Sequence, residues 1–109
     1  MFHETFYLVL IKIFLYIRMM KSNKYLAEFL GTLLLGLSAL ISGGNALVVG
    51  ATLALAIFFT ATISFGHLNP AISLMIYFKG GLSNIDLLGY IVSQCLGGVL
   101  AFYLFKTFA

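Results

Sequence analysis

Residues 64–76 read Ser64-Phe65-Gly66-His67-Leu68-Asn69-Pro70-Ala71-Ile72-Ser73-Leu74-Met75-Ile76 and pass from polar to apolar inside an otherwise apolar sequence. Pro70 is the only proline of the chain and directly follows Asn69. Asparagine is a favoured N-cap, and the fixed φ and missing N–H of proline suit the first helical position. This stretch therefore predicts a helix that begins at Pro70.

The helix predicted from Pro70 is short. Its apolar run ends at Phe78, which leaves about nine residues and, at ~1.5 Å per residue, roughly 13 Å of helix. That length is about half of a bilayer core. A half-length helix with an extended segment leading into it, here Ser64 to Leu68, is a re-entrant arrangement, which membranes tolerate only where the backbone lines a cavity enclosed by protein. The stretch therefore predicts a pore or a binding site.

The composition predicts an integral membrane protein. Of the 109 residues, 62% are hydrophobic and 8% are charged, whereas soluble domains carry about 25% charged residues. The single cysteine, Cys95, excludes a disulfide within the chain, and the sequence has no cluster of histidines or cysteines, so we expect neither a metal nor another cofactor. The net charge of +3 is explained by membrane orientation, and nucleic-acid binding is not expected.

The hydrophobic segments predict an all-α fold with three transmembrane helices and one re-entrant half-helix. The expected spans are Tyr25–Ile41, Ala46–Ile63 and Leu87–Phe105, and a polar loop over Lys79–Asp86 follows the half-helix.

Residues 1–24 form a leader ahead of the unit predicted over residues 25–109. Its apolar run, Phe6 to Ile17, is too short to span a bilayer, and its basic residues follow the run instead of preceding it as in a secretory signal. One interpretation is an amphipathic helix at the membrane interface. The other is that translation starts at Met19 or Met20 and the leader is dispensable.

Two polar side chains fall inside the predicted spans. An ionisable group at membrane depth needs a polar partner, so Glu28 should face the interior of the bundle; the alternative is a glutamate that snorkels to the headgroups. An unpaired carboxamide is also costly there, so Gln94 should hydrogen-bond to the irregular backbone of Ser64–Leu68.

Three motifs together resemble the aquaporin (major intrinsic protein) family, in particular the first of its two inverted repeats. The motifs are Ala27-Glu28-Phe29-Leu30-Gly31-Thr32, His67-Leu68-Asn69-Pro70-Ala71 and Tyr90-Ile91-Val92-Ser93-Gln94-Cys95-Leu96-Gly97. The similarity runs from about Tyr25 to Phe105. It implies half of an aquaporin-like bundle of six helices.

The resemblance implies a channel for water or small neutral solutes, with Asn69, Pro70 and Ala71 at the narrow midpoint. If the side-chain oxygen of Asn69 caps the helix, its NH₂ group stays free to bind the oxygen of a passing water, which interrupts a proton wire. The positive end of the helix dipole adds a barrier to cations at the same place.

The resemblance also assigns roles to the loop and its neighbours. The carbonyls of Phe65, Gly66 and His67 would be acceptors along the pore, and Glu28 and Gln94 would brace the loop from behind. For the His67 side chain we expect fixation by a loop hydrogen bond and no gating role.

Two positions depart from the pattern usual in the family. A small residue is usual at Phe65, whose bulk would either narrow the cytoplasmic vestibule or tilt outward into packing. Val49 stands where many water-selective members have an aromatic residue, which favours a wider constriction and glycerol-like solutes.

The family pore needs two re-entrant half-helices, and one proline allows one. The filter arginine that family members carry after their second Asn-Pro-Ala is absent too, since Arg18 is the only arginine. We therefore expect a channel subunit that pairs with a second half, either a second copy or a separately encoded repeat. The alternative is a truncated fragment that conducts nothing and acts at most as a membrane interaction partner. No catalytic set of residues indicates an enzyme.

The basic residues predict the orientation. With three spans, five fall on one side, Lys12, Arg18, Lys21, Lys24 and Lys79, and Lys106 alone falls on the other. The positive-inside rule then places the N-terminus in the cytoplasm and the C-terminus outside, most simply in the plasma membrane.

Overall fold

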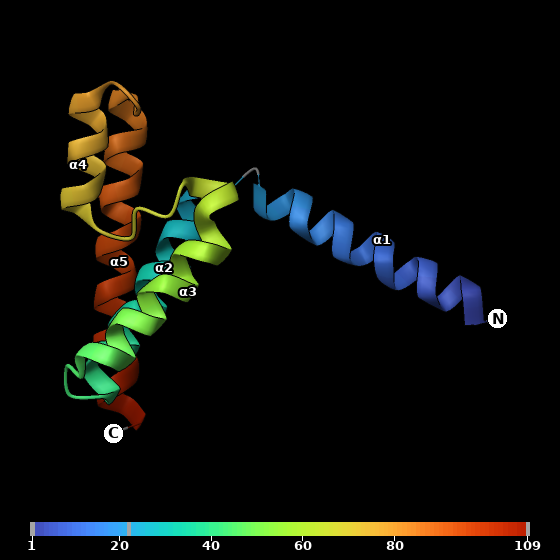
Figure 1. The fold of residues 1–109 in the computed structure, drawn as a ribbon, viewed down its shortest axis with the longest axis horizontal. Coiled ribbons are helices and arrows are strands. Elements are labelled where there is room, and N and C mark those ends of the chain that lie inside the picture. Colours follow the sequence, from blue (N-terminus) through green and yellow to red (C-terminus); the bar gives the residue numbers. More distant parts are fainter. Residues whose placement is uncertain (1, 22, 109) are drawn as a thin grey trace.

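The structure, a computed structural model, describes residues 2–21 and 23–108. These residues form five α-helices and no strand (Figure 1). The helices are α1 (Phe2–Lys21), α2 (Lys24–Ile41), α3 (Ala46–Ser64), α4 (Pro70–Lys79) and α5 (Asn84–Phe108). The predicted all-α fold is confirmed.

Three of the helices, α2, α3 and α5, are long and apolar enough to cross a membrane. Helix α2 packs against both α3 and α5, and the short α4 packs beside the N-terminal part of α5 (Figure 1). The arrangement of three membrane spans and one half-helix agrees with the prediction, and the chain is a multi-pass membrane protein.

The ends of two helices differ from the predicted ones. Helix α5 starts at Asn84 instead of Leu87, because the hydroxyl of Ser83 accepts a hydrogen bond from the Asp86 amide at 3.1 Å and so caps an earlier first turn. Helix α4 runs one residue past Phe78 to Lys79. The polar loop between them is accordingly shorter than expected.

Glycines let α2 and α5 approach closely. A Cβ at Gly97 of α5 would lie 2.5 Å from the carbonyl oxygen of Phe29 and 3.1 Å from the amide nitrogen of Leu33, both on α2. A Cβ at Gly36 would lie 2.9 Å from that of Ala101. Small residues at this spacing are the usual means by which membrane helices pack backbone to backbone.

A polar cluster ties the start of α2 to the start of α5. Lys24 forms a salt bridge with Asp86, with Nζ and Oδ2 2.6 Å apart, and the Tyr25 hydroxyl donates to the other carboxylate oxygen at 2.5 Å. This cluster fixes the end of the bundle from which α1 departs.

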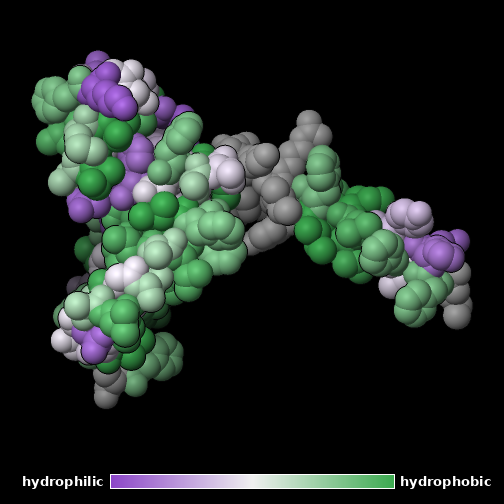
Figure 2. All heavy atoms as spheres, viewed as in Figure 1, coloured by the Kyte–Doolittle hydropathy of each residue, from purple (hydrophilic) through white to green (hydrophobic). Residues whose placement is uncertain are grey.

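Helix α1 extends away from the end of the bundle where α2 begins, in a direction transverse to α2 and α3 (Figure 1). From Phe2 to Leu15 every side chain is exposed, and most of the surface of this segment is apolar (Figure 2). Helix α1 is not among the helices that meet the length and composition of a membrane span. Residues Phe2–Lys21 of the leader are therefore helical, and the place of this helix at the membrane stays a prediction.

Candidate functional site

The loop between α3 and α4 is a compact turn built on left-handed residues. Phe65, Gly66 and Leu68 have φ angles of 65°, 60° and 55°. The prediction of an extended Ser64–Leu68 segment is therefore wrong, because the chain must turn from the end of α3 into α4 within five residues. Non-glycine residues in this conformation cost of order 1–3 kcal/mol each, so the surrounding contacts must hold them there.

Glu28 supplies those contacts. Its Oε1 accepts hydrogen bonds from the amide of Leu68 at 2.6 Å and from Nε2 of Gln94 at 2.8 Å. Its Oε2 accepts from the amide of His67 at 3.0 Å and from the hydroxyl of Ser64 at 2.6 Å. The side chain is 0% exposed, so the alternative of a snorkelling glutamate is wrong. One carboxylate therefore satisfies two main-chain donors of the loop and two side chains.

Gln94 is buried, but its partners are not the predicted ones. Its Nε2 donates to Glu28 and, at 2.9 Å, to the hydroxyl of Ser73 on α4, and it makes no bond to the loop backbone. The physical reason is that Glu28 already takes the loop amides, which leaves the Gln94 amide to bond to Glu28 itself. The Oε1 of Gln94 has no partner among the described residues.

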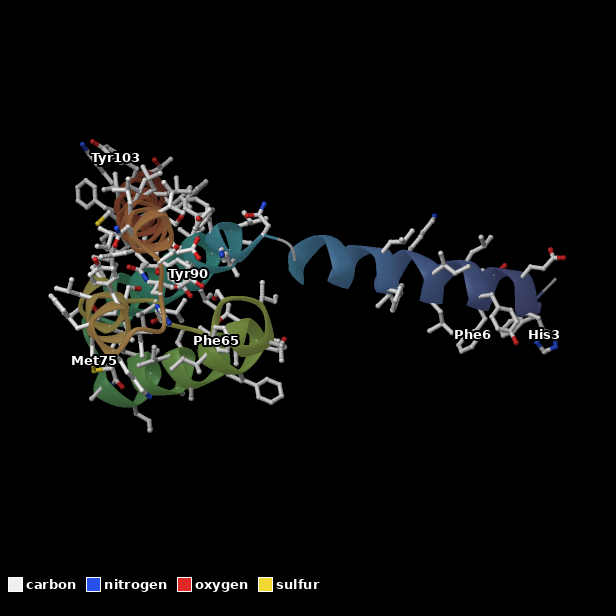
Figure 3. The ribbon with its side chains drawn as sticks, turned by 90° about the horizontal axis from the view of Figure 1, so that it is seen from above. His3, Phe6, Phe65, Met75, Tyr90 and Tyr103 are labelled. Carbon is white, nitrogen blue, oxygen red and sulfur yellow. The ribbon has the colours of Figure 1, made fainter. Side chains whose placement is uncertain are left out.

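Ser73 and Tyr90 also belong to this network, and the sequence analysis did not predict either of them. Ser73, which is 0% exposed, lies 2.8 Å from Nδ1 of His67. Tyr90 donates to the carbonyl of Ser64 at 2.9 Å, and its ring packs on that of His67 with centroids 4.8 Å apart. Figure 3 shows Tyr90 toward the middle of the bundle. A signal existed for Ser73, because it is the only serine or threonine inside the apolar run of α4.

Leu68 rests on a glycine of α2. Its side chain is 2% exposed, and a Cβ placed on Gly31 would contact the Leu68 side chain within van der Waals radii. The small residue in the first motif therefore makes room for the loop.

Asn69 caps α4 as its sequence position indicates. Its Oδ1 accepts from the amide of Ala71 at 2.8 Å, and Pro70 occupies the first helical position. All three residues are exposed, and the NH₂ group of Asn69 has no partner among residues 2–21 and 23–108. The N-terminus of α4 thus presents a free amide donor.

Phe65 and Val49 lie at opposite ends of α3. Phe65 is 83% exposed and lines an open cavity of about 560 Å³ together with His67, Lys24 and Lys79. Val49 is half-buried near the start of α3, at the end opposite to Phe65. The structure therefore brings Glu28, Gln94 and the loop together and leaves Val49 at a distance along the helix.

Three membrane spans that hold a short, asparagine-capped helix define a polytopic membrane protein with one re-entrant segment. A model of the family described as Major intrinsic protein matches residues 16–109. The chain belongs to this family, and its fold is half of an aquaporin-like bundle. The resemblance inferred from the three motifs is confirmed, and the match begins nine residues before the Tyr25 at which that resemblance starts.

Relatives named as glycerol uptake facilitators or aquaporins are similar to this chain in sequence. The "Glycerol uptake facilitator protein-like 6" of Lactiplantibacillus plantarum is 37% identical over 94 residues, which cover 79% of this chain and 44% of the relative. The "Glycerol uptake facilitator protein" of Streptococcus pneumoniae is 33% identical over 72% of this chain and 40% of its own. "Aquaporin Z" of Photorhabdus laumondii is 36% identical over 53% of this chain and 25% of its own. The chain spans less than half the length of these relatives. No solved structure matches it.

Proposed function

We propose that the chain forms one half of a membrane channel for water or small neutral solutes. The observation that carries the proposal is the free amide of Asn69 at the N-terminus of α4, on a loop whose amides are held by Glu28. A re-entrant helix that presents a donor and the positive end of its dipole binds the oxygen of a neutral molecule and repels cations. The names of the relatives, aquaporin and glycerol uptake facilitator, support the same class of solute.

Within this class we favour a glycerol-like solute. Many water-selective members of the family have an aromatic residue at the position of Val49. The smaller valine would leave a wider constriction. The relatives in Lactiplantibacillus and Streptococcus that cover most of this chain also carry glycerol in their names.

A second half would complete the pore, because one re-entrant helix reaches only half of the membrane. The tripeptide Asn69-Pro70-Ala71 is exposed, which leaves this face accessible to a second half-helix. Gly50 and Ala54, four residues apart on α3, are exposed as well, and a Cβ at Gly50 would meet nothing within 4 Å. Small exposed residues at this spacing suit close packing by another helix.

The second half is proposed to be a distinct sequence and not an inverted second copy. The five basic residues on one side against Lys106 on the other favour one orientation, with the N-terminus in the cytoplasm and the C-terminus outside the plasma membrane. An antiparallel homodimer would need both orientations. The test is a C-terminal fusion to reporters active on only one side: a substantial population with the C-terminus inside would contradict the proposal.

Flux through vesicles tests the channel itself. Stopped-flow light scattering of proteoliposomes should give no water or glycerol permeation for the chain alone. Permeation is expected once a partner with a second Asn-Pro-Ala motif and a following arginine is co-reconstituted. Flux from the lone chain would overturn the need for a partner. No flux with the partner would favour the second candidate, a non-conducting fragment that acts only through membrane contacts.

We also propose that α1 lies at the membrane interface. Its side chains from Phe2 to Leu15 are exposed and mostly apolar, and its single mid-helix charge, Lys12, would reach the headgroups. The chain has no tryptophan, so Phe6→Trp or Phe14→Trp introduces a unique fluorophore. Both should be quenched by lipids brominated near the headgroup. Quenching of Phe14→Trp by deeply brominated lipids alone would indicate a fourth span, and no quenching would mean that α1 does not touch the bilayer.

A further inference from the structure

A buried series of polar side chains leads from Glu28 to His67. Nε2 of Gln94 lies 2.8 Å from Oε1 of Glu28 and 2.9 Å from Oγ of Ser73, and Oγ of Ser73 lies 2.8 Å from Nδ1 of His67. All four side chains are buried. Glu28, the first member of the series, determines the direction of each hydrogen bond that follows.

Glu28 fixes the orientation of the Gln94 amide. Both carboxylate oxygens already accept from main-chain amides, those of His67 and Leu68, which can only donate. The oxygen of Gln94 would be repelled by these acceptors, so the NH₂ group faces Glu28. Its second hydrogen then points at Ser73, and the hydroxyl oxygen of Ser73 accepts it.

Ser73 passes this direction on to the imidazole. A hydroxyl has one hydrogen to donate, and for Ser73 the available acceptor among the described residues is Nδ1 of His67. If Nδ1 carried the proton, it would donate to Ser73, and the Ser73 hydrogen would be left buried without an acceptor, which is unfavourable. Nδ1 therefore accepts, and a neutral imidazole must carry its hydrogen on the other nitrogen.

We infer that Ser73 holds His67 in the tautomer protonated on Nε2, so that the imidazole presents a hydrogen-bond donor to the open cavity beside the loop. His67 lines this cavity of about 560 Å³ together with Phe65 and Tyr90. Its Nε2 makes no hydrogen bond to any residue within 2–21 and 23–108. The ligand class is an acceptor oxygen, that of a water or of a solute hydroxyl, and Ser73 is the positioning residue.

The inference refines the site of the proposed function but does not require that the chain conduct. His3 and His67 are the only histidines, and His3 is exposed on α1, far from the bundle (Figure 3). A His3→Gln chain labelled with ¹⁵N-histidine therefore reports on His67 alone. Long-range ¹H–¹⁵N correlation in lipid nanodiscs, at alkaline pH where the imidazole is neutral, identifies the protonated nitrogen.

The expected spectrum is a single pattern with Nδ1 unprotonated and Nε2 protonated. Ser73→Ala should lose this single pattern and populate both tautomers, whereas Ser73→Thr, which keeps the hydroxyl, should retain it. A protonated Nδ1 in the unsubstituted chain would overturn the inference, whatever the variants do. So would a Ser73→Ala spectrum identical to that of the parent. Because no flux is measured, a failure of the channel proposal leaves this result unaffected.

Discussion

Tyr90 on α5 donates its hydroxyl hydrogen to the carbonyl oxygen of Ser64, the last residue of α3, across 2.9 Å. Helix α2 packs against both α3 and α5, and within residues 2–21 and 23–108 α3 and α5 have no packing contact of their own. The tyrosine is 1% exposed, so the carbonyl at the start of the re-entrant loop has this hydroxyl as its partner in a dry environment. One hydrogen bond thus links the third span to the point where the chain leaves the second.

Tyr90→Phe should therefore destabilise the bundle. The substitution keeps the ring against His67 but leaves the Ser64 carbonyl buried and unpaired, which costs about 1–3 kcal/mol. Thermal unfolding in detergent, followed by circular dichroism, measures the loss. The control is Tyr103→Phe on the same helix, whose side chain is 57% exposed and should give no comparable change. Equal melting of the two variants would mean that the hydroxyl of Tyr90 is not structural.

Glu28→Leu should be the most damaging single change in the loop. It leaves the amides of His67 and Leu68 without their acceptor, at about 1–3 kcal/mol for each buried group, and leaves the hydroxyl of Ser64 with only the Thr60 carbonyl at 3.4 Å. Hydrogen exchange of the Leu68 amide should accelerate together with the loss of thermal stability. Gln94→Leu should cost less, because Ser73 and Glu28 keep their other partners.

The matched control for Glu28→Leu is Glu4→Leu on the exposed helix α1, which should leave both measurements unchanged. If the Leu68 amide exchanged at the parent rate in Glu28→Leu, the role of Glu28 in holding the loop would have to be abandoned.

Two adjacent glycines of α5 offer a direct test of helix packing. Gly97→Ala would drive a Cβ into the carbonyl oxygen of Phe29, a backbone atom that cannot rotate away, so α2 and α5 must separate at a cost of about 1–3 kcal/mol. A Cβ at Gly98 meets nothing within 4 Å, so Gly98→Ala should be neutral or stabilising by up to about 1 kcal/mol. If both substitutions shifted the melting temperature in the same direction, this packing would be contradicted.

The parts of the fold that depend on local chemistry were predictable from sequence. Asn69 before Pro70 indicates the start of α4, and apolar length indicates the three spans, because capping and burial in lipid act within one segment. The partners of Gln94 and the positive φ of Phe65 and Leu68 were not predictable. They depend on which groups Glu28 already satisfies, and that is decided only when α2, α5 and the loop are brought together.

The last prediction concerns the amide of Asn69. Asn69→Asp keeps an oxygen to cap α4, so the free energy of unfolding should change little, whereas Asn69→Ala should lose about 0.5–2 kcal/mol. Asn69→Asp nevertheless replaces the free NH₂ donor by a negatively charged acceptor at the positive end of the helix. In the assembly that conducts water, the aspartate variant should therefore admit protons or sodium that the parent excludes.

A matched control is available at another asparagine cap of the chain. Asn45 caps α3 by accepting from the amides of Leu47 and Val48 at 3.1 Å, outside the re-entrant loop. Asn45→Asp makes the same chemical change, so it should leave cation exclusion intact in the same proteoliposomes. Equal exclusion by Asn69→Asp and Asn45→Asp would remove Asn69 from the mechanism. Leakage in both variants would instead show that any added negative charge at a helix cap abolishes selectivity, whether or not it lies in the pore.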